Sequence, residues 1–150
     1  MNVPDLHDLE ISGVHTWRGD PHALASAAAA AKLRFLLAEL KGVSSKVELL
    51  AALAKGLQLP AHFGGNWDAL EDCLTDFSWH QAAGYVLLLH GADGLAQRCP
   101  DDYGVLIDVL GACAQYWRER WRERAMPFFA VAIDPRANLA LPLLYNERSL

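Results

Sequence analysis

Three short apolar runs, at residues 34–40, 84–90 and 127–133, constrain the fold of this chain more than any other feature. The run at 84–90 is almost uninterrupted, which is typical of a strand that is covered on both faces. Sequence that favours helices separates the runs, and strands joined by helical crossovers form parallel sheets. The sequence therefore predicts an α/β fold, with a small parallel sheet and helices packed on it, in one domain.

The N-terminal part of the chain adds to this pattern. Residues 1–10 are predicted to be a loose leader, and residues 11–17 to form a short strand. A helix should follow, because Asp20 is a good N-cap and Pro21 suits the first helical position. We expect residues 1–32 to be an extension, with a strand and a helix, that belongs to the same globule.

Further along the chain, either Ser44 or Ser45 can cap a helix, and Ser45 and Glu48 have the spacing of a capping box, which predicts that a helix begins there. Residues 91–102 are predicted to be a loop that can hold one helical turn. A long helix is expected over residues 103–124. Two interpretations of residues 139–145 stay open, an edge strand or a tail that packs on the domain.

Composition and charge exclude several classes of function. The net charge of −5 argues against direct binding to nucleic acid, which requires a positive surface. The chain shows neither a signal peptide nor an apolar run long enough to span a membrane. Its three cysteines lack the spacing of a metal site or a disulfide framework, so we expect reduced thiols and a cytoplasmic protein.

A charged helix is predicted over residues 67–76. Gly64 and Gly65 interrupt regular structure, and Asn66 is a strong N-cap. The helix places acids on one face: Asp68, Glu71, Asp72 and Asp76. No Lys or Arg occurs between His62 and Gln97, and carboxylates at this spacing repel one another. The pattern favours an anionic surface that binds a cationic partner.

Catalysis is the main alternative. Asp68 and Asp72, with His62, resemble the side chains of a hydrolase that uses carboxylates, with or without a divalent metal. No second acidic segment completes such a site, and no nucleotide-binding or nucleophile motif is present. Cys73 falls on the apolar face, as a buried thiol would. We therefore predict no catalytic residue, no bound metal and no cofactor.

Residues 59–74 resemble a motif of the barstar family of ribonuclease inhibitors. The motif is Leu-Pro, two residues that are often aromatic, then Gly-x-Asn-x-Asp-Ala-Leu-x-Asp-Cys-Leu. The order of strands and helices is also similar, so the resemblance covers residues 33–133 and leaves 134–150 as a tail or edge strand. It implies a three-stranded parallel sheet and a monomer that binds a small basic ribonuclease one to one. Its carboxylates would take the place of RNA phosphates in the active site of that enzyme.

The resemblance assigns roles residue by residue. Asp72 matches the central phosphate mimic and Asp68 its acidic companion, while His62 and Phe77 occupy the positions of a contact tyrosine and tryptophan. The resulting set of predicted contact residues is Asp72, Asp68, His62, Phe63, Gly64, Asn66, Trp67, Glu71, Asp76 and Phe77.

Three positions depart from the family pattern. His62 replaces an aromatic residue, and Glu71 replaces a tryptophan. A contact glutamate of the long helix has no counterpart near residues 111–112. These departures leave open a module of the same fold that binds another basic protein.

Overall fold

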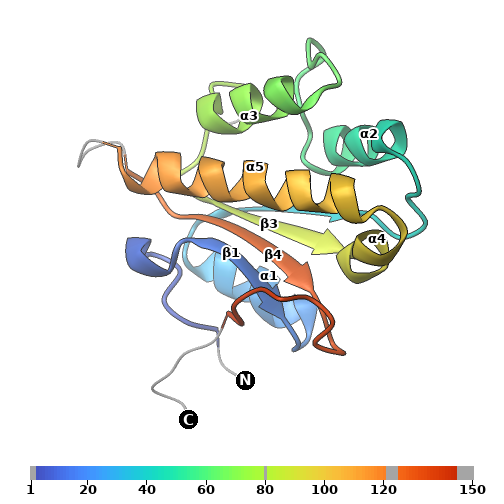
Figure 1. Cartoon of the computed structure of the whole chain (residues 1–150). Coiled ribbons are helices and arrows are strands. Elements are labelled where there is room, and N and C mark those ends of the chain that lie inside the picture. Colours follow the sequence, from blue (N-terminus) through green and yellow to red (C-terminus); the bar gives the residue numbers. More distant parts are fainter. Residues whose placement is uncertain (1–2, 80, 121–124, 145–150) are drawn as a thin grey trace.

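The computed structural model of the chain describes residues 3–79, 81–120 and 125–144. It contains a sheet of four parallel strands in the order β1-β4-β3-β2 (Figure 1). The strands are β1 (Gly13–Trp17), β2 (Arg34–Glu39), β3 (Tyr85–His90) and β4 (Phe128–Ile133). The predicted α/β fold with a small parallel sheet is confirmed. The N-terminal extension supplies the fourth strand, β1, at the edge beside β4.

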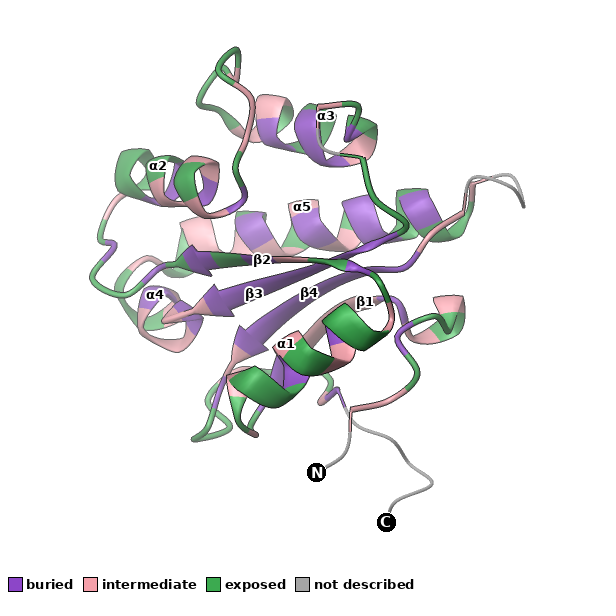
Figure 2. Cartoon of the chain, turned by 180° about the vertical axis from the view of Figure 1, so that it is seen from behind, coloured by how far each residue is buried: buried purple, intermediate pink, exposed green. Residues whose placement is uncertain are grey.

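Helices cover the two faces of the sheet unequally. The helix α1 (Pro21–Ala30) lies on one face, and Figure 2 shows it opposite the other helices. The other face carries α2 (Lys46–Gly56), α3 (Trp67–Asp76), α4 (Ala92–Arg98) and α5 (Pro100–Arg118). The first five residues of both β3 and β4 are buried, as expected for strands covered on both faces.

Alternate residues of the central strands enter two separate cores. Leu87 and Leu89 of β3 belong to the larger core, beneath the four helices. Val86 and Leu88 belong to the smaller core on the side of α1. This division follows from the two-residue period of a strand, which sends neighbouring side chains to opposite faces.

The prediction of a loose N-terminal leader is wrong for its described part, residues 3–10. Leu6 is only 3% exposed, because it packs in the smaller core with Trp17 and Leu144. A short 3-10 helix, Leu9–Ile11, then leads into β1. The burial of Leu6 thus depends on the folded smaller core and not on the polar sequence around it.

Two helix boundaries differ from the prediction. Residues 91–102 are mostly helical rather than a loop, since α4 occupies Ala92–Arg98 and α5 already begins at Pro100. Proline is well suited to this first helical position, where its missing N–H costs nothing. The helix α5 ends at Arg118, and residues 121–124 of the predicted long helix lie outside the described residues.

The C-terminal tail packs beside β1 through a single bridge. The Thr16 N–H donates to the Pro142 carbonyl at 2.9 Å, and the Leu144 N–H donates to the Thr16 carbonyl at 2.9 Å. Of the two interpretations of residues 139–145, the packed tail agrees better with this single bridge than an edge strand does. Tyr145 lies outside the described residues. Within the described ranges, no helix is long and apolar enough to cross a membrane.

Candidate functional site

The helix α3 begins at a well-formed cap. The Asn66 side-chain oxygen accepts a hydrogen bond from the Ala69 N–H at 2.8 Å. Gly65 precedes the cap with a φ of +70°, a conformation that costs most other residues energy. The chain therefore turns sharply out of the loop and into the helix, as the sequence predicts.

The other end of α3 is held by two indoles. The Trp79 Nε1–H donates to the Cys73 carbonyl at 3.2 Å, and the Trp117 Nε1–H donates to the Leu74 carbonyl at 2.8 Å. Phe77 ends the helix in a left-handed conformation, with its N–H directed to the Cys73 carbonyl. Carbonyls that would lack a partner at a helix end are thus satisfied, and Trp117 ties α3 to α5.

The exposed and buried faces of α3 are sharply separated. Three side chains are buried: Leu70, Cys73 and Leu74. Four acidic side chains are exposed: Asp68, Glu71, Asp72 and Asp76. Across residues 3–79, 81–120 and 125–144, the one ion pair joins Glu39 to His90, so none of these four acids is paired with a cation. The helix therefore presents unneutralised negative charge to solvent.

The two thiols beneath this face, Cys73 and Cys113, have raised pKa values. Burial raises the pKa of the Cys73 thiol, and the nearby charges of Asp72 and Asp76 raise it further. Burial also raises the pKa of Cys113 on α5 to about 12, with a smaller contribution from Glu71. Both thiols stay protonated at neutral pH, as expected for structural cysteines.

A cavity of about 370 Å³ lies between α3 and the loop before it. It is lined by His62, Phe63, Gly64, Ala69, Asp72, Cys73, Asp76 and Trp79. The structure thus brings together five of the predicted contact residues, two of which are carboxylates. The predicted contact residues Asn66, Trp67, Asp68 and Glu71 lie on the same loop and helix but do not line the cavity.

Trp79 is a site residue that sequence reasoning missed. It lines the cavity, is half-buried, and packs against Phe77 with ring centroids 5.4 Å apart. The available signal was a second aromatic residue just after the helix. The register of the motif pointed to Phe77 instead, because Phe77 stands where the family has a tryptophan.

The predicted contact role of Phe77 does not agree with its position. Its side chain is only 2% exposed and stacks on Tyr85 with centroids 3.7 Å apart. The left-handed turn at Phe77 directs the ring into the larger core rather than toward solvent. Phe77 therefore anchors the end of α3 and leaves almost no side-chain surface for a partner.

The neighbouring face of α5 carries no acid in the register of the family glutamate. Ala112 is exposed and Gly111 is half-buried, and a Cβ added to Gly111 would meet nothing within 4 Å. The described part of the chain also holds no group of three or more His, Cys, Asp or Glu side chains that could bind a metal.

Comparison with known proteins decides the family. The model of a family described as Barstar (barnase inhibitor) matches residues 33–132 of the chain. The chain belongs to the Barstar family. This family is one of inhibitors rather than enzymes. The match begins after α1, so β1 and α1 lie outside the part that the family model covers.

A solved structure shows a similar arrangement of elements. It is the Aeropyrum pernix ORC2 protein in its ADPNP–ADP complexes, with a TM-score of 0.53 and 17% sequence identity. The likeness covers 84% of this chain but only 36% of that one. At such low identity it supports the fold alone. No curated protein matches the chain.

Proposed function

We propose that this chain inhibits a small basic ribonuclease of the barnase type by inserting α3 and the preceding loop into its active site. The observation that carries the proposal is the set of four exposed, unpaired carboxylates on a helix whose two ends are fixed. Repulsion between carboxylates at this spacing destabilises the free chain. A cationic partner relieves this repulsion, which favours binding.

Asp72 is the centre of the proposed contact. It lies in the cavity wall beside Asp76, with Phe63 and Trp79 close by. A ribonuclease holds RNA phosphates with Arg, Lys and His side chains, and a carboxylate can accept the same charge-assisted hydrogen bonds. Because both ends of α3 are held before binding, little conformational entropy remains to be lost.

The other proposed contact residues extend this centre. Asp68 and Glu71 widen the anionic surface, and their long-range attraction accelerates association with a basic protein. The rings of His62 and Phe63 line the cavity on the side of the loop. The inhibitor acts by occupying the site, as a monomer in a one-to-one complex in the cytoplasm, without a cofactor and without contacting RNA.

Replacement of Asp72 tests the proposal. Asp72→Asn keeps the shape of the side chain and removes its charge, so it should weaken binding to barnase by about 2–5 kcal/mol, as loss of a desolvated ion pair does. Calorimetry and inhibition of ribonuclease activity measure the effect. The association rate of the wild-type chain should also fall as salt increases, because screening weakens the attraction.

The matched control is Glu10→Gln, which removes one exposed acid outside α3. It changes the net charge equally and should leave the affinity nearly unchanged. If both variants bind as tightly as the wild type, then α3 does not carry the interaction and the proposal fails.

The departure on α5 favours a second candidate, a module that binds a basic protein without nuclease activity. Exposed Ala112 offers no carboxylate where the family has a contact glutamate. A partner captured by the wild-type chain, lost with Asp72→Asn and inactive on RNA would support this second candidate over the first.

A further inference from the structure

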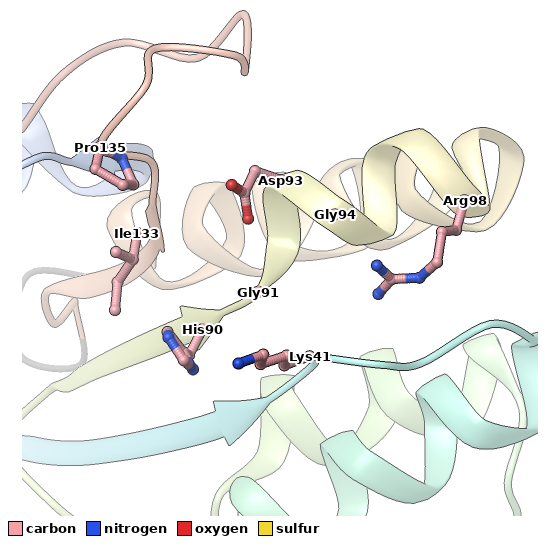
Figure 3. A pocket seen from close by; sticks show the side chains of 8 residues that line it. All are labelled: Lys41, His90, Gly91, Asp93, Gly94, Arg98, Ile133 and Pro135. Atoms are coloured by element: carbon pink, nitrogen blue, oxygen red, sulfur yellow. The ribbon is translucent and has the colours of Figure 1, made fainter.

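A second cavity lies at the carboxyl ends of β2, β3 and β4, away from α3. It has a volume of about 270 Å³ and is lined by Lys41, His90, Gly91, Asp93, Gly94, Arg98, Ile133 and Pro135 (Figure 3). None of these residues belongs to α3 or to the loop before it. In sheets of parallel strands, ligands characteristically bind at the carboxyl edge, where the loops after neighbouring strands converge.

Arg98 is held in place at this cavity. Its Nε–H donates to the Val43 carbonyl at 2.8 Å, and an Nη2–H donates to the Leu40 carbonyl at 3.4 Å. These bonds use two of the five N–H groups of a guanidinium. A Cβ on Gly94 would lie 2.6 Å from Nη1, so the absence of a side chain there leaves room for the guanidinium.

Lys41 is brought to the same cavity by close packing of two loops. Gly91 has a φ of +86°, and a Cβ added to it would lie 2.6 Å from the Lys41 backbone nitrogen. Only glycine permits this approach. Figure 3 shows the Lys41 side chain extending toward His90, and the Arg98 side chain projecting from the end of α4.

The acids near Lys41 have different roles. Both carboxylate oxygens of Glu39 already have partners. One lies 2.7 Å from His90 Nδ1, and the other accepts a hydrogen bond from the Lys41 backbone N–H at 3.0 Å. Asp93 projects from α4 into the cavity. Over the described ranges, neither Lys41 nor Arg98 forms an ion pair with an acid.

We propose that this cavity binds a small organic phosphate. The phosphate group lies between Lys41 and Arg98, which offer a mobile ammonium and a fixed guanidinium for charge-assisted hydrogen bonds. Asp93 accepts a hydrogen bond from a hydroxyl of the organic part, and the apolar side chains of Ile133 and Pro135 contact its carbon atoms. The volume is just below the range typical of drug-sized ligands, which limits the ligand to a few carbon atoms.

The test uses the full chain and NMR titration with inorganic phosphate and with glycerol phosphate, at an ionic strength kept constant with chloride. We expect saturable shifts of the Gly91 and Gly94 amide signals and tighter binding of glycerol phosphate, because only that probe carries an organic part with alcohol hydroxyls for Asp93. Lys41→Ala should weaken binding about tenfold, the loss expected for one charge-assisted contact.

Lys55→Ala is the matched control, since Lys55 is an exposed lysine on α2 that does not line the cavity. It should bind glycerol phosphate as the wild type does. The absence of saturation with either probe would overturn the proposal, as would equal affinity for the two probes. Equal weakening by both lysine replacements would also overturn it, because nonspecific charge would then explain the binding. The variants leave α3 unchanged, so ribonuclease inhibition is tested separately.

Discussion

Replacement of Trp117 by Phe should destabilise the chain through the end of α3. The Trp117 Nε1–H donates to the Leu74 carbonyl at 2.8 Å, and both residues are buried, at 8% and 0% exposure. Phenylalanine keeps a ring beside Phe77 but removes the donor. The carbonyl then lies in an apolar environment without a partner, at the point where α3 joins α5.

The expected cost follows from two contributions. A buried acceptor that loses its partner costs about 1–3 kcal/mol. The loss of about three heavy atoms leaves a small void, which adds roughly 1–2 kcal/mol. The free energy of unfolding should therefore fall by about 2–5 kcal/mol, which urea titration followed by circular dichroism can measure.

Trp79→Phe is the matched comparison, because it makes the same chemical change at the same end of α3. The Cys73 carbonyl that receives the Trp79 N–H also accepts a hydrogen bond from the Phe77 N–H at 3.2 Å, and Trp79 is half-exposed. Trp79→Phe should therefore lower the free energy of unfolding by about 1 kcal/mol or less. If Trp117→Phe costs no more than Trp79→Phe, the assigned role of the buried Leu74 carbonyl is refuted.

Two further predictions concern other parts of the fold. Gly56→Ala should destabilise the chain by about 1–3 kcal/mol in the same urea assay, because the added Cβ would lie 2.5 Å from the Leu37 carbonyl oxygen and the Ala38 Cα. This loss should outweigh the helix propensity that alanine gains over glycine. An increase in stability would contradict the close packing of α2 on β2. Burial lowers the pKa of His15 from its usual 6.5, and the contact of its Nε2 with the Ile11 carbonyl opposes this only in part. The unfolded chain therefore binds the proton more readily, so the stability that His15 contributes above pH 6.5 should be lost as the pH falls below it. His15→Gln should lose less stability over that acidic range, and parallel curves for the two proteins would contradict the prediction.

Much of the fold could be predicted because local sequence and tertiary structure agree. The run at 84–90 is apolar at nearly every position, which is typical of a strand covered on both faces, and β3 is such a strand. Asn66 caps α3 through its own side chain, an interaction that depends on residues three apart in sequence. The acidic face of α3 likewise follows from helical periodicity alone.

The differences arise where distant segments meet. Leu6 has no local reason to be buried, but the smaller core offers it a place beside Trp17. The family register assigns Phe77 to a contact, whereas the left-handed end of α3 turns its ring onto Tyr85. Trp79 then lies in the cavity wall, a position that depends on how the chain leaves α3.

The sequence by itself therefore determined the parallel α/β architecture, the cap of α3 and the separation of acids from apolar residues along that helix. These properties depend on periodicity and on contacts between close neighbours in the chain. Tertiary structure alone decided that β1 joins the sheet beside β4 and that Trp117 fixes the end of α3. It also decided that Lys41 and Arg98 share a cavity. The physical reason is that pairing, burial and close approach between distant residues depend on the shape of the whole core.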